Sequence, residues 1–184
     1  VLSGAYRVAH GAVRLTAEDY KPQLATTVVR RLTIVTEEEL ENRVTQRQGA
    51  ILSQLAEAAR AARASAYAPY SRFRVGAAVL LANGAQIRGA NIENASFGLT
   101  CCAERVAIFS ATAQHPGVRI KALAVCAGDD SHAHESDNGP MPCGACRQVM
   151  MEFMAADAPI WIDGVGKMAL SDLLPTPFKL RTDT

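Results

Sequence analysis

The sequence lacks any apolar run that approaches the roughly 20 residues needed to cross a bilayer, and it opens without a compact apolar segment ending in a cleavage signal. We therefore expect a cytoplasmic protein with no membrane partner. It also lacks a surplus of charge, since 19 Lys and Arg residues stand against 18 Asp and Glu residues. Nucleic-acid-binding proteins usually carry a marked basic excess, so this balance argues against nucleic acid and favours a small, near-neutral substrate.

Cysteine is scarce as well, with five residues in a chain of 184. An odd number of cysteines, grouped at positions 101, 102, 126, 143 and 146, does not suit a disulfide framework. Metal or redox chemistry fits the grouping better. What the chain does have is 49% hydrophobic and 20% charged residues, which is typical of a folded globular protein.

Apolar periodicity and turn residues predict an alternation of helices and strands. Ile120 to Ala127 is nearly all apolar and thus long enough for a strand covered on both faces, which predicts an α/β sandwich. The expected elements are a helix from Thr36 to about Ser65, strands at Phe73–Leu81 and Gln86–Ala90 joined by an Asn83-Gly84 turn, a helix at Cys102–Ala113, the strand at Ile120–Ala127, a helix from Cys143 to about Ala155, a strand at Ile160–Ile162 and a helical turn at Ala169–Leu174.

A metal chelate is predicted where Cys143-Gly144-Ala145-Cys146 follows Pro142 at a helix start, because the first helical turn directs both sulfurs toward one point. The helix N-terminus also favours the thiolates that zinc requires. Alone, this pair equally suits a structural zinc knuckle or a redox centre. Cys102, about 40 residues earlier at another predicted helix start, supplies a third thiolate and leaves the fourth tetrahedral position open for water, as in catalytic zinc sites.

Glu104 is the candidate general acid and base. On a regular helix its side chain would diverge from that of Cys102 by about 200°, so both can reach a metal-bound water only at the helix tip. There, a carboxylate can take a proton from zinc-bound water and deliver it to a substrate nitrogen. Arg105, three residues after Cys102, and Arg147, next to Cys146, are expected to offset the charge of the three thiolates.

Cys102-Ala103-Glu104-Arg105 with a downstream Pro-Cys-x-x-Cys resembles the zinc-dependent cytidine deaminases, specifically the small homotetrameric, three-cysteine type. The resemblance runs from about Gln48 to Phe178. It implies a three-layer α-β-α sandwich with a mixed five-stranded sheet, one zinc per chain, and a homotetramer with shared active sites. It also implies hydrolysis of cytidine and deoxycytidine to uridine and deoxyuridine with release of ammonia, in pyrimidine salvage, by zinc-bound hydroxide attacking C4 while Glu104 shuttles protons.

The same resemblance assigns substrate contacts. Asn91 and Glu93 would bind the ribose hydroxyls, Phe73 would stack on the pyrimidine, and Ala103 would offer backbone groups to the base. Phe97, where the family commonly has Tyr, and Phe178 would reach the site of a neighbouring subunit. The first 40 or so residues have no counterpart in compact family members, so we expect an N-terminal extension over residues 1–44 and the catalytic domain over residues 45–184.

Other interpretations stay open at this point. Asn91 and Glu93 can simply cap loop backbone, Phe73 can belong to the core, and Cys101 can complete a four-thiolate site. Rival functions are a deaminase of a cytosine-bearing antibiotic such as blasticidin, an editing deaminase of RNA or DNA, and a non-catalytic zinc-stabilised interaction module. Asn91, Glu93 and Phe73 favour free nucleosides, the charge balance disfavours nucleic acid, and Glu104 beside an open ligand position disfavours the inert module.

Overall fold

The structure is a computed structural model that describes residues 6–8, 11–13, 36–128 and 141–180. The chain divides into two compact units, Val1–Glu37 and Glu38–Thr184. In the first unit, strands β1 (Tyr6–Val8) and β2 (Gly11–Val13) pair antiparallel, which the sequence did not predict. Much of the expected 1–44 extension lies outside the described residues, so the domain boundary at 44/45 stays a prediction. No helix of the described ranges is long and apolar enough to cross a membrane.

The second unit is built on a mixed five-stranded sheet with the order β4-β3-β5-β6-β7. Its strands are β3 (Val75–Leu81), β4 (Gln86–Ala90), β5 (Ile120–Ala127), β6 (Pro159–Ile162) and β7 (Gly166–Ala169). Only the β5–β6 pair is parallel, and the other neighbours are antiparallel. The predicted mixed sheet is confirmed, although β7 falls in a segment where no strand was expected.

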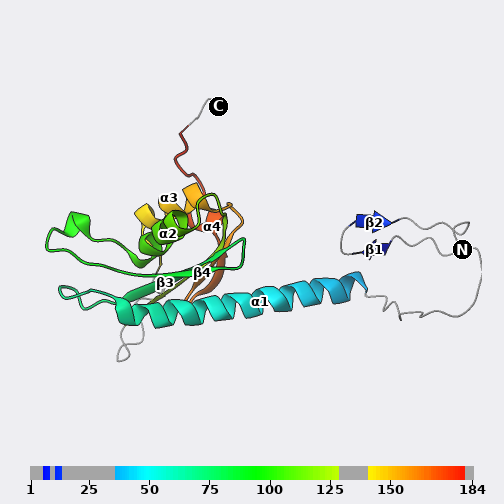
Figure 1. The fold of residues 1–184 in the computed structure, drawn as a ribbon, viewed down its shortest axis with the longest axis horizontal. Coiled ribbons are helices and arrows are strands. Elements are labelled where there is room, and N and C mark those ends of the chain that lie inside the picture. Colours follow the sequence, from blue (N-terminus) through cyan, green and yellow to red (C-terminus); the bar gives the residue numbers. More distant parts are fainter. Residues whose placement is uncertain (1–5, 9–10, 14–35, 129–140, 181–184) are drawn as a thin grey trace, which may run out of the picture. The chain divides into compact units, whose positions relative to one another are not determined.

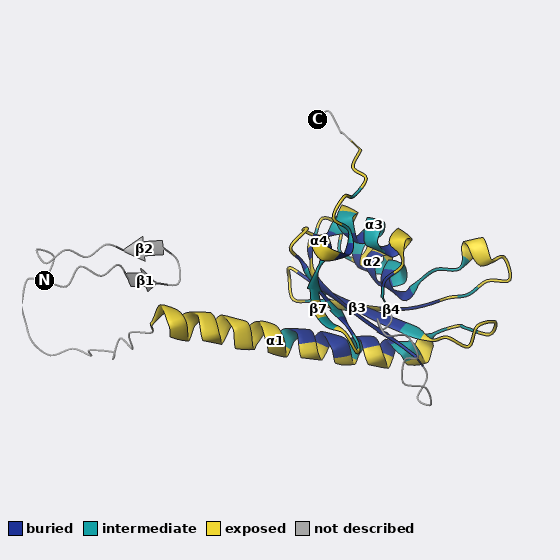
Figure 2. Ribbon diagram, turned by 180° about the vertical axis from the view of Figure 1, so that it is seen from behind, coloured by how far each residue is buried: buried dark blue, intermediate teal, exposed yellow. Residues whose placement is uncertain are grey.

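Helices cover both faces of this sheet, as Figure 1 shows. Helix α1 (Glu37–Ala62) packs on one face, where Leu55 and Ala59 meet Ala78 and Ala124. Helices α2 (Ala103–Gln114) and α3 (Gly144–Phe153) pack on the other face, around a core that includes Met150. The three-layer sandwich is therefore confirmed. The first half of α1 is exposed, whereas its second half buries a stripe against the sheet (Figure 2).

The central strands are buried on both sides because alternate residues of an extended chain point to opposite faces. In β3, Val79 belongs to the core under α2 and α3, and Ala78 belongs to the core under α1. The strand begins at Val75, two residues later than predicted. Phe73 consequently lies outside the strand with 49% of its surface exposed, and the interpretation of Phe73 as a core residue is wrong.

Two glycines set how closely the helices approach the sheet. A Cβ atom on Gly89 of β4 would lie 2.4 Å from the backbone nitrogen of Ala107 and 2.5 Å from the carbonyl oxygen of Ala103, both in α2. A Cβ atom on Gly76 of β3 would lie 2.1 Å from the carbonyl oxygen of Ala59 in α1. Without a side chain, Gly76 lets α1 lie directly on β3. Gly89 lets α2 lie directly on β4, which fixes the position of the first turn of α2.

The remaining elements are short. They comprise the 3₁₀ turns η2 (Arg63–Ser65) and η3 (Phe97–Leu99) and the helix α4 (Leu170–Leu173), which matches the predicted helical turn. The guanidinium of Arg60 on α1 forms an ion pair of 2.7 Å with Asp163, directly after β6. This contact joins α1 to the end of the sheet where β5 and β6 terminate.

Candidate metal centre and active site

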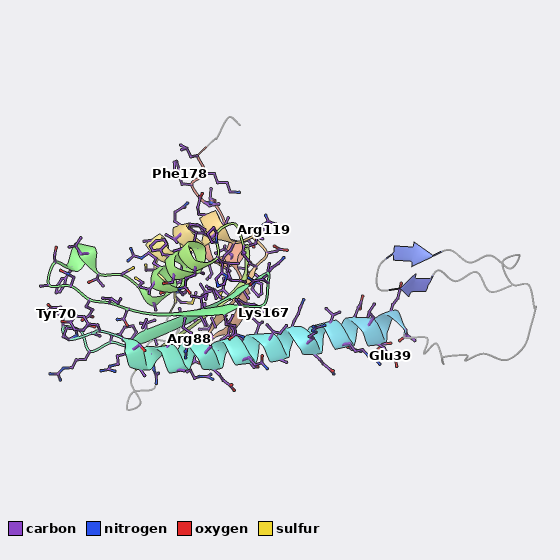
Figure 3. The ribbon with its side chains drawn as sticks, in the orientation of Figure 1. Glu39, Tyr70, Arg88, Arg119, Lys167 and Phe178 are labelled. Atoms are coloured by element: carbon purple, nitrogen blue, oxygen red, sulfur yellow. The ribbon has the colours of Figure 1, made fainter. Side chains whose placement is uncertain are left out.

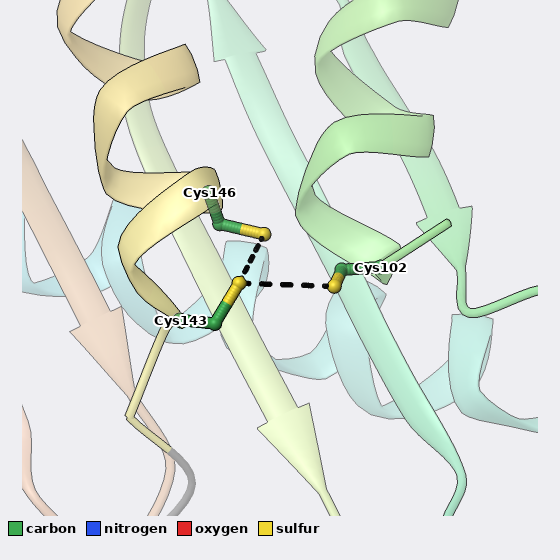
Figure 4. A group of neighbouring side chains, drawn as sticks. All are labelled: Cys102, Cys143 and Cys146. Atoms are coloured by element: carbon green, nitrogen blue, oxygen red, sulfur yellow. Dashed lines mark hydrogen bonds between the residues drawn. The ribbon is translucent and has the colours of Figure 1, made fainter. Parts of the chain in front are cut away.

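Two helix N-termini bring three cysteines together beside the ends of the central strands. Cys102 is the N-cap residue of α2 and Cys143 is the N-cap residue of α3, and both have extended backbone conformations. Cys146 lies in the first turn of α3 and is buried. Because Cys102 precedes the helix instead of forming part of it, its side chain can point across to α3, as Figure 4 shows.

The distances among the three sulfurs suit zinc. The Sγ atom of Cys143 lies 3.9 Å from that of Cys102 and 3.5 Å from that of Cys146. All three lie within 4.8 Å of one another. Tetrahedral zinc with Zn–S bonds of about 2.3 Å holds its sulfur ligands roughly 3.8 Å apart. The predicted ligand set Cys102, Cys143 and Cys146 therefore fits a zinc ion with little movement.

Cys101 does not join this cluster. Its backbone exchanges two hydrogen bonds of 2.9 Å with Ile92, so residue 101 continues an extended bridge while residue 102 turns into the helix. Nothing in the described part of the chain adds a fourth protein ligand to the group. The arrangement matches a catalytic site with an open position, not a closed four-thiolate site.

The electrostatics of the cluster favour a cation. A hydrogen bond from the Cys146 thiol and the nearby guanidinium of Arg105 lower the pKa of Cys102 to about 5. The pKa of Cys146 is raised, because it gives this hydrogen bond to Cys102 and because burial disfavours a second negative charge. A divalent cation among the sulfurs would remove that penalty and stabilise all three thiolates.

The two arginines differ in what they contact. Arg105 donates from Nη2 to the Sγ atom of Cys102 at 3.5 Å and to the carbonyl oxygen of Thr100 at 3.0 Å, so it lies where it offsets thiolate charge. Arg147 instead donates to the carbonyl oxygens of Pro142 at 2.7 Å and Leu173 at 2.9 Å. The bond to Pro142 holds the segment that precedes α3 against the helix. A role for Arg147 in offsetting the sulfur charge stays a prediction.

Glu104 lies in the first turn of α2, beside the cluster, and is only 4% exposed. Burial raises the pKa of its carboxyl group, and a hydrogen bond with Cys146 and the charge of Arg105 act in the opposite direction. A carboxyl group with a raised pKa can both accept and release a proton nearer neutral pH. The proton-transfer role of Glu104 stays a prediction, which its burial beside the cluster supports.

Asn91 and Glu93 both hold loop backbone. Asn91, 7% exposed, accepts a hydrogen bond of 2.8 Å from the Val75 amide and donates one of 2.9 Å to the Phe73 carbonyl. Glu93 accepts from the amides of Tyr70 at 2.9 Å and Ser71 at 3.2 Å, and from the Ser71 hydroxyl. The backbone-capping interpretation thus describes these contacts. Ribose binding by the same groups stays a prediction.

The three aromatic residues predicted to contact substrate lie on the surface, namely Phe73, Phe97 and Phe178. Phe97 is 74% exposed and meets Tyr70 edge to face, with ring centroids 6.1 Å apart. Phe178 is 72% exposed, and its backbone exchanges hydrogen bonds of 2.8 Å and 3.2 Å with the amide of Gln148 on α3. Figure 3 shows Tyr70 on the loops that project beyond the sheet and Phe178 on the C-terminal tail. Ala103, in contrast, is fully buried as the first residue of α2.

Residues 50–161, more than half of the chain, match the family described as the cytidine and deoxycytidylate deaminase zinc-binding region. The chain belongs to this deaminase family. The resemblance, the zinc cofactor and the enzyme class of a zinc-dependent hydrolase are thereby confirmed.

Individual relatives agree with the family match. The chain is 48% identical over 122 residues to a cytidine deaminase of Halalkalibacterium halodurans, which covers 64% of this chain and 86% of that protein. It is 45% identical over 120 residues to a cytidine deaminase of Mycobacterium tuberculosis, covering 65% of this chain and 83% of that protein. The crystal structure of a cytidine deaminase from Burkholderia pseudomallei is similar, with 44% identity, a TM-score of 0.60, and coverage of 68% of this chain and 98% of that one.

Three residues to which the sequence analysis assigned no role contact candidate site residues, namely Ser71, Thr100 and Gln148. Ser71 had a local signal, because a serine two residues before an amide commonly accepts a hydrogen bond from it, as Ser71 Oγ does from the Phe73 amide at 3.0 Å. Thr100 accepts a hydrogen bond from Arg105, and the side chain of Gln148 donates one to the backbone of Phe178. No local sequence pattern predicts either contact.

Proposed function

We propose that this deaminase hydrolyses cytidine and deoxycytidine to uridine and deoxyuridine with release of ammonia, as a cytoplasmic enzyme of pyrimidine salvage that acts on free nucleosides. The observation that carries the proposal is the buried Glu104 carboxyl beside three converging cysteine sulfurs. The curated relatives named cytidine deaminase support the same substrate class.

Cys102, Cys143 and Cys146 would hold the zinc. When bound, the ion supplies a Lewis acid that lowers the pKa of a water ligand to roughly 7. Arg105 keeps the three thiolates from overcompensating this positive charge, because its guanidinium lies against the Cys102 sulfur.

Glu104 moves the protons. Its carboxylate takes a proton from the attacking water and delivers it to the ring nitrogen of cytosine. It then takes the second proton from the hydroxyl group now attached to C4 and gives it to the amino group, which leaves as ammonia while the C4 carbonyl forms. Burial favours the neutral form of a carboxylic acid, so the proton that Glu104 has accepted is retained until the substrate takes it.

The substrate would be positioned by the loops at the same end of the sheet. Phe73 would stack on the pyrimidine, Ala103 would contact the base through its backbone, and Asn91 and Glu93 would bind the ribose. Glu93 is partly exposed and is held by the loop that carries Phe73, so the proposed sugar and base contacts are close neighbours in the structure.

A homotetramer with shared active sites completes the proposal. Large apolar side chains are exposed on the projecting loops and on the C-terminal tail, and such groups are usually covered by a partner. They are Tyr67, Tyr70, Phe73, Ile92, Phe97, Leu99, Phe178 and Leu180. Phe97 and Phe178 would enter the site of a neighbouring copy.

The function is tested by the loss of cytidine ultraviolet absorbance on addition of the protein, with and without a zinc chelator, together with zinc content. We expect chelator-sensitive conversion and about one zinc per chain.

Glu104→Gln should keep zinc and fold while the rate of deamination falls by roughly 100-fold or more. Glu152→Gln, an exposed carboxylate on α3, is the matched control and should retain full activity. A folded, zinc-loaded protein that converts neither nucleoside would contradict the function, and an active Glu104→Gln would remove Glu104 from the chemistry.

A further inference from the structure

The Ser71 hydroxyl links two groups to which the proposed function gives different tasks. It donates a hydrogen bond to Oε1 of Glu93, the candidate ribose ligand. It also accepts a hydrogen bond of 3.0 Å from the amide of Phe73, the candidate stacking residue. Ser71 is itself exposed and lies outside any helix or strand, so these two bonds are what its side chain contributes to the site.

The carboxylate of Glu93 is nearly saturated by this loop. A carboxylate offers about four acceptor positions over its two oxygens. Oε2 accepts the amides of Tyr70 at 2.9 Å and Ser71 at 3.2 Å, which fills that oxygen. Oε1 accepts the Ser71 hydroxyl and, among the residues that the structure describes, keeps one further acceptor position. The direction of the remaining acceptor is therefore set by where Ser71 binds.

The backbone conformation around Ser71 is held by hydrogen bonds on both sides. Arg72 has a φ of 59°, and it is the one non-glycine residue with a positive φ in the part of the chain that the structure describes. A side chain rarely adopts this conformation unless surrounding contacts impose it. The Arg72 amide bonds the Ala68 carbonyl at 3.1 Å, and Asn91 Nδ2 donates to the Phe73 carbonyl at 2.9 Å, so the turn is fastened on both sides of Ser71.

We propose that Ser71 is a positioning residue for sugar recognition, aiming the free acceptor of Glu93 at a ribose hydroxyl while tying that carboxylate to the backbone of Phe73. The inference rests on the proposed nucleoside deaminase function and assigns a residue that acts through Glu93 without touching the reacting atoms. In support, the hydrogen bond from Ser71 lowers the pKa of the Glu93 carboxyl group, which keeps it an ionised acceptor.

The test compares ligands with and without the sugar hydroxyls. In Ser71→Ala, the KM for cytidine should rise roughly 10-fold, as expected for loss of a hydrogen bond to a charged group, while kcat changes less than about twofold. The inhibition constant of 2′,3′-dideoxycytidine, which keeps the base and the 5′-hydroxyl but lacks the 2′ and 3′ hydroxyls, should change by less than about threefold. In a Glu93→Gln background, Ser71→Ala should add little further loss, because the two residues act as one unit.

Two variants serve as controls. Ser71→Thr keeps the hydroxyl at an exposed position with room for a methyl group, so it should restore most of the cytidine affinity. Ser53→Ala removes an exposed serine from α1 and should leave both ligands unaffected. Zinc content and melting temperature of each variant are measured alongside.

Several results would contradict the proposed role of Ser71. Equal losses for cytidine and the dideoxynucleoside, or loss of zinc, would show a general role of the loop and overturn the inference. Unchanged cytidine kinetics, or full additivity with Glu93→Gln, would overturn it as well. Wild-type protein inert toward cytidine would overturn the proposed function first and the role of Ser71 with it, so the two failures are distinguished by measuring the wild type.

Discussion

Cys101 and Cys102 are neighbours in the sequence, but they face different surroundings. The Cys102 sulfur lies 3.9 Å from that of Cys143, whereas Cys101 pairs through its backbone with Ile92. The difference arises because the chain changes from an extended bridge to a helix between these residues. Burial raises the pKa of the Cys101 thiol, while contacts with Cys146 and Arg105 lower that of Cys102.

This contrast predicts the outcome of single cysteine substitutions. Zinc should be lost when any one ligand is replaced, in Cys102→Ala, Cys143→Ala or Cys146→Ala. Removing a residue that only hydrogen-bonds a metal ligand lowers metal affinity by roughly 10- to 100-fold, so removing a ligand itself should lower it further. Cys101→Ala and Cys126→Ala should keep about one zinc per chain, since neither sulfur belongs to the cluster. Metal analysis after dialysis measures this. Zinc loss in Cys101→Ala equal to that in Cys102→Ala would show that the ligand set is wrong.

Cys143 and Cys146 could be predicted as zinc ligands because their geometry is local. Two cysteines three apart at a helix start converge whatever the rest of the fold does. Cys102 lies 41 residues before Cys143 and was identified by the motif Cys102-Ala103-Glu104, which resembles that of a known family, at a second predicted helix start. The loop contacts could not be predicted in the same way. Glu93 receives its hydrogen bonds from Tyr70 and Ser71, which lie 23 and 22 residues earlier, and only the folded chain brings them together.

At the scale of elements, the site depends on how closely α2 lies on β4. Ala103 begins α2, and its carbonyl would be 2.5 Å from a Cβ atom placed on Gly89. Any side chain at this position must push the first turn of the helix outward. That turn carries Glu104 and follows Cys102, so packing on the sheet and geometry of the metal centre are coupled.

Gly89→Ala should therefore destabilise the domain by about 1–3 kcal/mol or more and reduce zinc retention, because the obstructing atoms are backbone that cannot rotate away. The matched control is Gly49→Ala, in α1, where an added Cβ meets no atom within 4 Å. Alanine is a better helix former, so this variant should gain about 0.5–1 kcal/mol. Urea unfolding compares the two. Equal stability of both variants would show that the close approach of α2 to β4 carries no energetic weight.

Long apolar elements were predicted from the sequence, and so was the edge strand β4, but the short strands β1, β2 and β7 were not. The run in β5 and the alternation in β3 identified the central strands, because burial on one or two faces leaves a clear pattern. Strand β7 (Gly166–Ala169) has four residues at the sheet edge and starts with a glycine of φ 110°, which gives weak strand signals. It pairs with β6 as a short antiparallel hairpin, and β1 pairs with β2 in the same way over three residues.

At the scale of the whole molecule, large exposed apolar side chains are found on the projecting loops and on the C-terminal tail. Phe97 and Tyr70 contact each other on loops that project from the sheet, and the tail bearing Phe178 is fastened to α3 by Gln148. Helix α3 also carries Cys146, so the metal centre and the tail share one support. An exposed aromatic side chain on an anchored backbone is suited to filling a site on another copy.

Combining two impaired variants in one oligomer tests whether the active sites are shared between subunits. Phe178→Ala should lower activity roughly 5- to 100-fold, the range for loss of an aromatic contact to a base, and Glu104→Gln abolishes proton transfer. If Phe178 serves a neighbouring site, a Phe178→Ala chain beside a Glu104→Gln chain has an intact glutamate and receives an intact phenylalanine. In a random equal mixture about one quarter of the sites then work, because each chain and its neighbour are drawn independently.

Co-expression of the two variants with different affinity tags allows the mixed oligomers to be purified and assayed. Activity near a quarter of wild type would support shared sites, whereas activity no higher than the mean of the two separate variants would mean that Phe178 acts within its own chain or not at all. Leu180→Ala provides the control, since it removes another exposed apolar side chain from the same tail. Mixed with Glu104→Gln, it should give about half of wild-type activity, because every chain with an intact Glu104 still receives Phe178 from whichever neighbour it has.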